Sequence, residues 1–181
     1  DYEGHFNAWL QEEGWLSYRD DDHDSLDDIS EETRAYSLIP GRFYINLEGR
    51  EPRGVVPQEE YEATRAELKS ALESLEGPDG NPVADRVVTR EEAFRGDHDD
   101  IAPDLVVVPN HGFDLKAGFK GDEDVFGVGP RNGMHSFDNA SLFIDDDARV
   151  VDADLFDIAP TLLDLLELDV DRAELDGSSL L

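Results

Sequence analysis

Residues 105–109, Leu-Val-Val-Val-Pro, form an uninterrupted apolar run. Apolar residues at successive positions predict a strand that is covered on both faces, as strands of parallel sheets are. Strand-like segments also occur at residues 42–47, 83–89 and 141–144, and segments with helical periodicity separate several of them. This alternation predicts an α/β fold in which helices cover a sheet.

Three segments carry apolar residues at helical spacing and predict helices over residues 5–13, 58–75 and 155–166. Between the first two, Pro40 and Gly41 predict a turn beside a strand-like segment. We therefore expect a β-hairpin or cap element within residues 35–57. The 181 residues are enough for one domain with a core, and we expect a single domain over residues 1–181.

The chain is strongly acidic, with 45 Asp and Glu residues against 15 Lys and Arg residues and a formal net charge of −30. Such a surface repels nucleic acid and anionic membranes, so neither is an expected partner. The acids are spread along the chain, which favours a halophilic protein over an acidic calcium-binding protein with ligand-spaced loops.

The chain contains no cysteine, which excludes disulfides, iron–sulfur clusters and thiolate zinc sites. No apolar run approaches the roughly 18 residues that a membrane span requires. We find no signal-peptide pattern, and we expect a cytoplasmic protein.

Three segments carry a family resemblance. They are residues 41–54 (GRFYINLEGREPRG), residues 102–107 (APDLVV), and a third that runs from Gly-Met-His at 133–135 through DIAPTLL at 157–163 to Leu-Asp-Gly at 175–177. In this order they resemble the C-terminal part of the type I phosphodiesterase/nucleotide pyrophosphatase family, within the alkaline phosphatase superfamily. Residues 6–16 resemble the helix that follows the Asp-His-Gly metal motif of that family.

The resemblance implies a partial alkaline-phosphatase-like sheet and a reaction that uses two metal ions, zinc most often and manganese as the alternative. The metals activate a Thr or Ser nucleophile and stabilise a phosphoryl oxygen. The family's late Gly-x-His has a match here at His135, which we predict to be a metal ligand. Asp138 is a candidate to orient its imidazole.

The chain departs from the family pattern at the other catalytic positions. The nucleophile has no match, so we predict no catalytic nucleophile within this chain. Asp22-His23 and Asp97-His98 are not followed by glycine. We therefore expect a C-terminal fragment that is inactive alone and whose partner is the N-terminal half of the same polypeptide.

Arg50 and Asn46 are the candidate substrate-binding residues. Arginine forks suit phosphate recognition, and glycines and a proline shape the loop around Arg50. The substrate class is a small-molecule phosphate ester. We expect His23 and His98 to be solvated loop residues and His111 to be exposed or structural, although it follows a strand end where α/β proteins place active sites.

Two alternatives stay open. The first is another member of the superfamily, a sulfatase or a phosphomutase, which the missing nucleophile region would identify. The second is a non-catalytic acidic module that binds a partner or an ion. A fragment of a larger sheet would expose an apolar face or edge, so we also predict a homodimer of the fragment.

Overall fold

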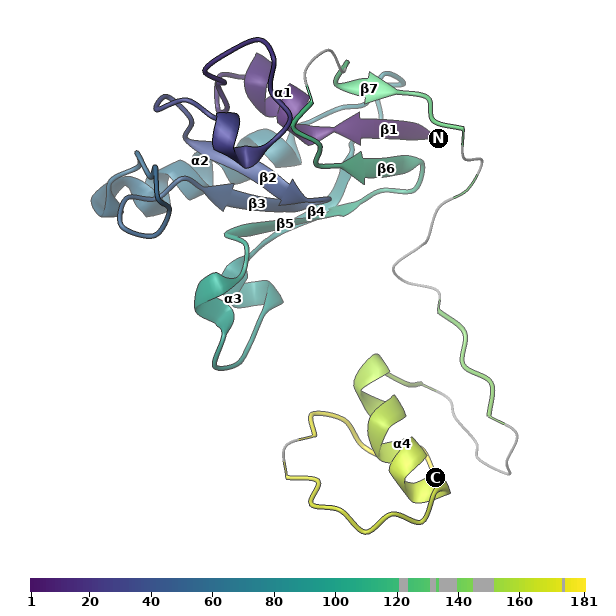
Figure 1. The fold of residues 1–181 in the computed structure, drawn as a ribbon. Coiled ribbons are helices and arrows are strands. Elements are labelled where there is room, and N and C mark those ends of the chain that lie inside the picture. The colour runs from purple at the N-terminus through teal and green to yellow at the C-terminus, as the bar shows by residue number, and fades with distance from the viewer. Residues whose placement is uncertain (121–123, 131–132, 134–139, 145–151, 174) are drawn as a thin grey trace. The chain divides into compact units, whose positions relative to one another are not determined.

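The computed structural model describes residues 1–120, 124–130, 133, 140–144, 152–173 and 175–181 (Figure 1). The chain divides into two compact units, Asp1–Asp138 and Asn139–Leu181. The first unit contains two β-sheets and several helices, so the mixed α/β class is confirmed.

The larger sheet has four strands in the order β2-β3-β5-β4. They are β2 (Ala35–Ile39), β3 (Arg42–Ile45), β5 (Leu105–Pro109) and β4 (Ala84–Thr89). Every neighbouring pair is antiparallel. The prediction that residues 105–109 lie in a parallel sheet is therefore wrong, because an apolar run reports burial and not the direction of the neighbouring strands.

Strands β2 and β3 form the expected hairpin. The turn between them needs Gly41, whose φ of 71° is left-handed and whose Cβ would lie 2.8 Å from the carbonyl oxygen of Val107. Residues 46–56 then form a loop that returns to β3. The hairpin supplies two of the four strands of the sheet, and its role as a cap over a substrate stays a prediction.

The smaller sheet has the order β6-β1-β7, with β6 (Phe113–Lys116), β1 (Tyr2–His5) and β7 (Phe126–Gly127). Strand β1 pairs parallel with β6 and antiparallel with β7. The first strand of the sequence therefore lies in the middle of this sheet.

The helices follow the predicted periodicity. They are α1 (Phe6–Glu12), α2 (Tyr61–Glu73), α3 (Arg90–Ala93) and α4 (Ile158–Leu165), with short 3₁₀ turns η1 (Leu26–Asp28), η2 (Gln58–Glu60), η3 (Asp99–Ile101) and η4 (Leu155–Asp157). Ser25, Thr89 and Asp154 begin η1, α3 and η4 with capping boxes. Within the described residues, no helix has the length and hydrophobicity needed to cross a bilayer.

The core lies on one face of the four-stranded sheet. Phe43 and Leu105 point into it and are fully buried, as are Leu68 and Leu72 of α2. The ring of Phe6 from α1 meets the ring of Phe43 edge-on, with centroids 5.0 Å apart. Both helices therefore bury their apolar stripes against this face.

Helix α1 is also fixed to the sheet by a buried amide. Asn7 Nδ2 donates to the carbonyl oxygen of Ser37, and Asn7 Oδ1 accepts from the backbone N–H of Ser37, both at 2.8 Å. The same Nδ2 donates to Gly118 O at 3.0 Å. This pairing joins α1, β2 and the segment after β6, and it satisfies a side chain that would otherwise be buried at a cost.

The second unit contains η4, α4 and the closing segment. Asp157 accepts from the backbone N–H of Ser178, and Thr161 Oγ1 accepts from that of Leu180. Gly177 permits this return, because a Cβ there would lie 2.1 Å from the carbonyl oxygen of Phe156. The closing segment is therefore held against the first turns of α4.

Candidate functional site

The loop of residues 46–56 carries both predicted substrate residues. Backbone bonds from Val55 N and Val56 N to Asn46 O close the loop on β3. Gly54 lies so close to the preceding strand end that a Cβ would be 1.9 Å from the carbonyl oxygen of Leu47. The loop is therefore a tightly folded element, as its glycines and proline predict.

Asn46 has an interior position. Its side chain is 1% exposed, and its Nδ2 donates to the carbonyl oxygens of Thr33 and Arg53 at 2.9 Å each. The amide thus joins the loop to the segment before β2. A direct substrate contact by Asn46 stays a prediction, and the described geometry supports a role in positioning the loop.

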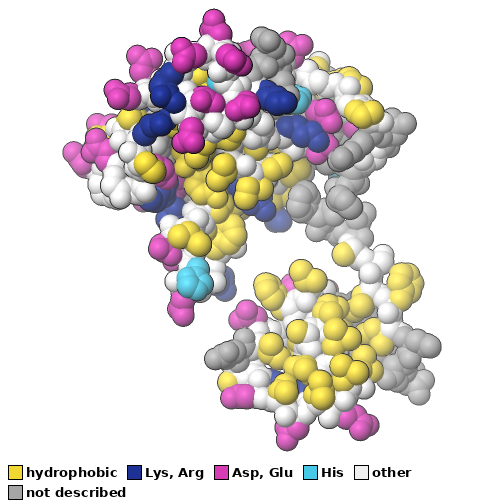
Figure 2. Space-filling model, viewed as in Figure 1, with side chains coloured by type: hydrophobic (Ala, Val, Ile, Leu, Met, Phe, Trp, Pro, Cys, Tyr) yellow, Lys and Arg dark blue, Asp and Glu magenta, His cyan; other side chains and the backbone are white. Residues whose placement is uncertain are grey.

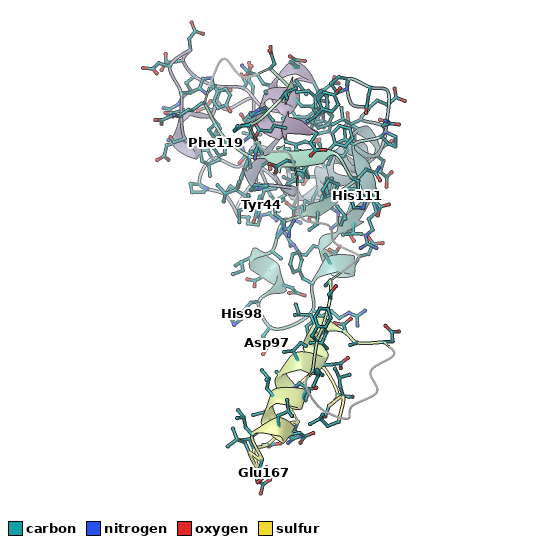
Figure 3. The ribbon with its side chains drawn as sticks, turned by 90° about the vertical axis from the view of Figure 1, so that its right-hand side faces the viewer. Tyr44, Asp97, His98, His111, Phe119 and Glu167 are labelled. Carbon is teal, nitrogen blue, oxygen red and sulfur yellow. The ribbon has the colours of Figure 1, made fainter. Side chains whose placement is uncertain are left out.

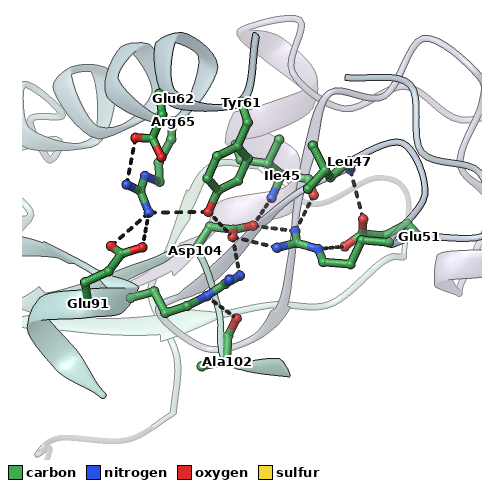
Figure 4. Close-up of polar contacts among 11 residues, drawn as sticks. Ile45, Leu47, Glu51, Tyr61, Glu62, Arg65, Glu91, Ala102 and Asp104 are labelled. Carbon is green, nitrogen blue, oxygen red and sulfur yellow. Dashed lines mark hydrogen bonds and ion pairs between the residues drawn. The ribbon is translucent and has the colours of Figure 1, made fainter. Parts of the chain in front are cut away.

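Arg50 lies at a buried carboxylate that the sequence analysis did not single out (Figure 4). Asp104 has no exposed surface, and it accepts hydrogen bonds from five donors. These are Ile45 N at 2.6 Å, Arg50 Nη1 at 2.7 Å, Arg50 Nη2 at 2.6 Å, Tyr61 Oη at 2.6 Å, and Arg90 Nη2. We call Asp104, Arg50, Tyr61 and Arg90 the Asp104 centre.

The centre joins five separate pieces of the chain. Ile45 ends β3, Arg50 belongs to the loop, Tyr61 begins α2, Arg90 begins α3, and Asp104 precedes β5. Two guanidinium groups and one carboxylate would leave an excess positive charge. Glu51 offsets it, because its Oε1 accepts from Arg50 Nε at 2.8 Å while its Oε2 accepts from Leu47 N at 2.9 Å.

The electrostatics follow from this geometry. Burial alone would raise the pKa of Asp104, but hydrogen bonds from Arg50, Tyr61 and Ile45 N hold it below its usual value. Burial lowers the pKa of Arg50, yet its bonds to Asp104 and Glu51 outweigh this and the pKa is raised. Burial and the bond to Asp104 raise the pKa of Tyr61 to about 12. All these groups therefore keep fixed charge states near neutral pH.

Arg65 of α2 extends the network towards solvent. Its Nη1 donates to both carboxylate oxygens of Glu91 at 2.9 Å and to Tyr61 Oη at 3.3 Å, and its Nη2 donates to Glu62 at 2.8 Å. Glu91 and Glu62 are mainly exposed. This outer part is an ordinary surface ion-pair group that supports the position of Tyr61.

The chemistry open to the centre is limited. A carboxylate that accepts five hydrogen bonds and faces two arginines is a poor general base and a poor metal ligand. Arg50 is different, because its side chain is 25% exposed and its Nη1 has a single acceptor among the described residues. Arg50 can therefore offer a further N–H to an anion while Asp104 holds it in place.

The sequence contained a signal for this centre. Asp104 is a charged residue directly before a fully apolar strand, inside the Ala-Pro-Asp-Leu segment. A carboxylate at such a position has to be paired. The identities of its partners depend on contacts between distant parts of the chain, and no local pattern predicted Tyr61 or Arg90.

The described histidines lie apart from this centre. His23 Nδ1 lies within hydrogen-bond distance of Phe119 O, and its ring stacks on Tyr18 with centroids 3.4 Å apart, so His23 is packed and not simply solvated. His98 is exposed beside Asp97 at the tip of the loop after α3, away from His111, which is also exposed (Figure 3). Among the described residues, no group of three or more His, Asp or Glu side chains could hold a metal ion.

His135, the predicted metal ligand, and Asp138 lie outside the described residues. The described part of the chain therefore brings Arg50 and Asn46 into one loop, and it does not place His135 relative to them. The roles of all three residues stay predictions.

Comparison with known protein families gives a match over most of the chain. A model of the family "Type I phosphodiesterase / nucleotide pyrophosphatase" matches residues 1–138, which include both sheets, the loop with Arg50 and the Asp104 centre. No curated protein and no solved structure matches the chain.

Proposed function

Because the chain belongs to the type I phosphodiesterase/nucleotide pyrophosphatase family, we propose that it is the C-terminal part of a metal-dependent phosphodiesterase or phosphohydrolase. The observation that carries this proposal is the family match over residues 1–138. The substrate would be a small-molecule phosphate ester. The nucleophile has no match in the printed sequence, so the active enzyme requires further polypeptide, and this chain alone is inactive.

The metal ions of the proposed enzyme, zinc or manganese, need ligands beyond this chain. The described residues do not fit a metal centre, since they contain no suitable group of three acidic or histidine side chains. His135 is the ligand that we propose from this sequence. A catalytic zinc site typically has about three protein ligands, so the others would come from the polypeptide that supplies the nucleophile.

Arg50 is the proposed phosphate contact. Asp104 and Glu51 fix its guanidinium group, its side chain is partly exposed, and Nη1 has a single acceptor among the described residues, which leaves an N–H for an anionic oxygen. A fixed arginine loses less side-chain freedom on binding than a mobile one. Asn46 supports this role by holding the loop, and the hairpin within residues 35–57 would form a wall beside the substrate.

The family match favours a phosphodiesterase over a sulfatase or a phosphomutase of the same superfamily, and over an acidic module without catalysis. The deciding residue in each case is the nucleophile outside this chain. A sulfatase requires a modified Cys or Ser at that position.

The test is an assay with bis(4-nitrophenyl) phosphate at saturating zinc and, separately, manganese. We expect no turnover by the 181-residue chain and turnover by the longer polypeptide that the proposal requires. His135→Ala in that polypeptide should abolish turnover and reduce bound metal. His98→Ala, which changes an exposed loop histidine, should leave both unchanged.

Two results would contradict the proposal. One is a longer polypeptide that hydrolyses no phosphate ester with either metal. The other is a His135→Ala variant that keeps full activity and full metal content, which would remove His135 from the site.

A further inference from the structure

The four-stranded sheet has a second face, opposite the core. Side chains alternate along a strand, so the strand pairing assigns each residue to a face. Phe43 and Leu105 are paired and point into the core. Their neighbours point the other way and define what we call the open face: Ile39, Arg42, Tyr44, Arg86, Val88, Val106 and Val108. Tyr36 has the same orientation but is buried in the core cluster, so it is not part of this face.

The open face is unusually apolar for a solvent-facing sheet. An antiparallel sheet with one solvated face normally carries polar residues there. Here Val106 lies at the centre and is 6% exposed, Val88 and Val108 are half-buried around it, and Ile39 is 53% exposed at the edge. Figure 2 shows hydrophobic side chains gathered over the strands below a band of Asp and Glu side chains. A contiguous apolar surface of this kind indicates a binding surface.

The charges on this face are as distinctive as its apolar residues. Although the chain has three acidic residues for every basic one, the open face contains no Asp or Glu. Its two arginines, Arg42 and Arg86, have no carboxylate partner among the described residues. Elsewhere in the described residues, Arg34, Arg50, Arg65, Arg90 and Arg172 form ion pairs, whereas Arg19 and Arg53 donate only to a backbone oxygen and Arg95 likewise lacks a carboxylate partner.

The two arginines are placed on either side of the apolar row of β5. Arg42 pairs with Val106 from β3, and Arg86 pairs with Val108 from β4. With strand spacings of about 4.8 Å and rises of about 3.3 Å per residue, their Cα atoms lie roughly 12 Å apart. A partner that presents an apolar row flanked by two carboxylates at this spacing would complement the face.

We propose that the open face is covered by the polypeptide that supplies the nucleophile and the remaining metal ligands. The inference rests on the proposed function. The contact consists of apolar side chains over Val106, Val88 and Val108, with carboxylates that pair with Arg42 and Arg86. If the covering element is a helix, those carboxylates lie about two turns apart, since two turns rise roughly 11 Å.

A second copy of the same face is a poor partner. In a two-fold symmetric contact each copy presents the same patch, so the arginines of the two copies would meet without any carboxylate between them. A small ligand is also disfavoured, since ligand sites are concave and the face of a sheet is open. The two arginines without carboxylate partners therefore favour contact with a different polypeptide that presents acidic side chains.

The absence of cysteine from this chain allows a direct test. Val108→Cys places a single reactive thiol on the open face, and Glu59→Cys places one at an exposed position before α2. If the longer polypeptide carries cysteines of its own, they are first replaced by serine. The maleimide reaction rate of each thiol is then measured in the 181-residue chain and in the longer polypeptide.

We expect the thiol of Val108→Cys to react at least about tenfold more slowly in the longer polypeptide, because a covered thiol reacts only when the contact opens. The rate at position 59 should be the same in both. Adding Arg86→Glu should restore fast labelling at position 108 in the longer polypeptide, because a carboxylate would then face a carboxylate. Lys69→Glu, the matched charge reversal on α2, should not.

Equal labelling rates at position 108 in both polypeptides would overturn the inference. A labelling rate in the 181-residue chain that falls as its concentration rises would also overturn it, since a second copy would then cover the face. Turnover of bis(4-nitrophenyl) phosphate is measured on the same samples. A longer polypeptide that is active but unprotected at position 108 refutes only the docking. One that is protected but inactive refutes only the proposed function.

Discussion

Helices α2 and α4 carry similar amphipathic patterns but reach different states. In α2 the apolar residues Tyr61, Leu68 and Leu72 are buried against the sheet. In α4 the corresponding residues stay in contact with solvent, with Leu162 51% exposed and Leu165 43% exposed. The periodicity predicts both helices, and only the presence of a facing surface decides whether the apolar stripe contributes to stability.

The difference has an energetic consequence. Full burial of a Leu side chain stabilises a fold by about 1.5–3 kcal/mol relative to its exposure. The first unit gains this contribution many times over, whereas the second unit buries only Pro160 and Thr161 on its helix. The second unit therefore depends on capping and on the closing segment, and its apolar side chains add little to its stability.

The largest expected effect is on the free energy of unfolding, and it compares the loss of a buried carboxylate with the loss of an exposed one. Asp104→Asn leaves Arg90 without a carboxylate partner and Arg50 with Glu51 alone, and we expect a loss of about 3–5 kcal/mol in the free energy of unfolding. Glu67→Gln is the matched change at an exposed carboxylate of the first unit, where the ion pair with Arg34 is open to solvent, and it should leave the transition nearly unchanged. Urea denaturation followed by tryptophan fluorescence measures the first unit alone, since it contains both Trp9 and Trp15. A loss below about 1 kcal/mol for Asp104→Asn would show that the centre is not essential to the fold.

The next effect tests the two helices directly. Leu68→Ala removes a fully buried side chain from α2 and should destabilise the first unit by about 2–5 kcal/mol. Leu162→Ala shortens an exposed side chain of α4 and should change stability by less than about 0.5 kcal/mol. Differential scanning calorimetry detects both units. If Leu162→Ala proved as harmful as Leu68→Ala, α4 would have a covering partner after all.

A smaller effect concerns pH. Asp104 has a lowered pKa in the folded state, so it binds a proton less readily there than in the unfolded chain. Its contribution to stability is full above the unfolded pKa of about 3.9 and is lost as the pH falls through the folded pKa. Stability measured from pH 6 downwards should therefore fall less steeply for Asp104→Asn than for the unmodified chain. Parallel curves would mean that Asp104 is not a source of the acid sensitivity.

The smallest effect is confined to the second unit. Gly177→Ala would bring a Cβ within 2.1 Å of Phe156 O, so the closing segment should detach from α4. We expect faster amide hydrogen exchange in Ile158–Leu165 and unchanged exchange in Tyr61–Glu73. A change in the exchange of α2 would show that the effect is not confined to the second unit.

Much of the fold could be predicted from the sequence. The helices at residues 6–12, 61–73 and 158–165 and the hairpin turn at Gly41 all follow from local periodicity and backbone preference. The direction of the strands around residues 105–109 could not be predicted, because an apolar run is equally consistent with parallel and antiparallel neighbours.

The site was less predictable for a similar reason. Arg50 was singled out as an anion-binding residue, but its partner Asp104 lies 54 positions away and Tyr61 lies 43 positions from Asp104. Such pairings arise only when strands and helices are assembled. Local patterns therefore identified a candidate side chain, and the tertiary structure showed what holds it.

The place of β1 in the smaller sheet has a consequence for how the chain folds. Strand β1 (Tyr2–His5) precedes both of its partners in the chain, yet it pairs with β6 (Phe113–Lys116) and β7 (Phe126–Gly127). More than 100 residues must leave the ribosome before either edge of β1 finds its neighbour. Long-range pairing of this kind is slow, because the entropy of closing the intervening loop is lost first. Strand β1 should therefore be among the last parts of the first unit to become ordered, and it stays unpaired from its own synthesis until β6 has been made.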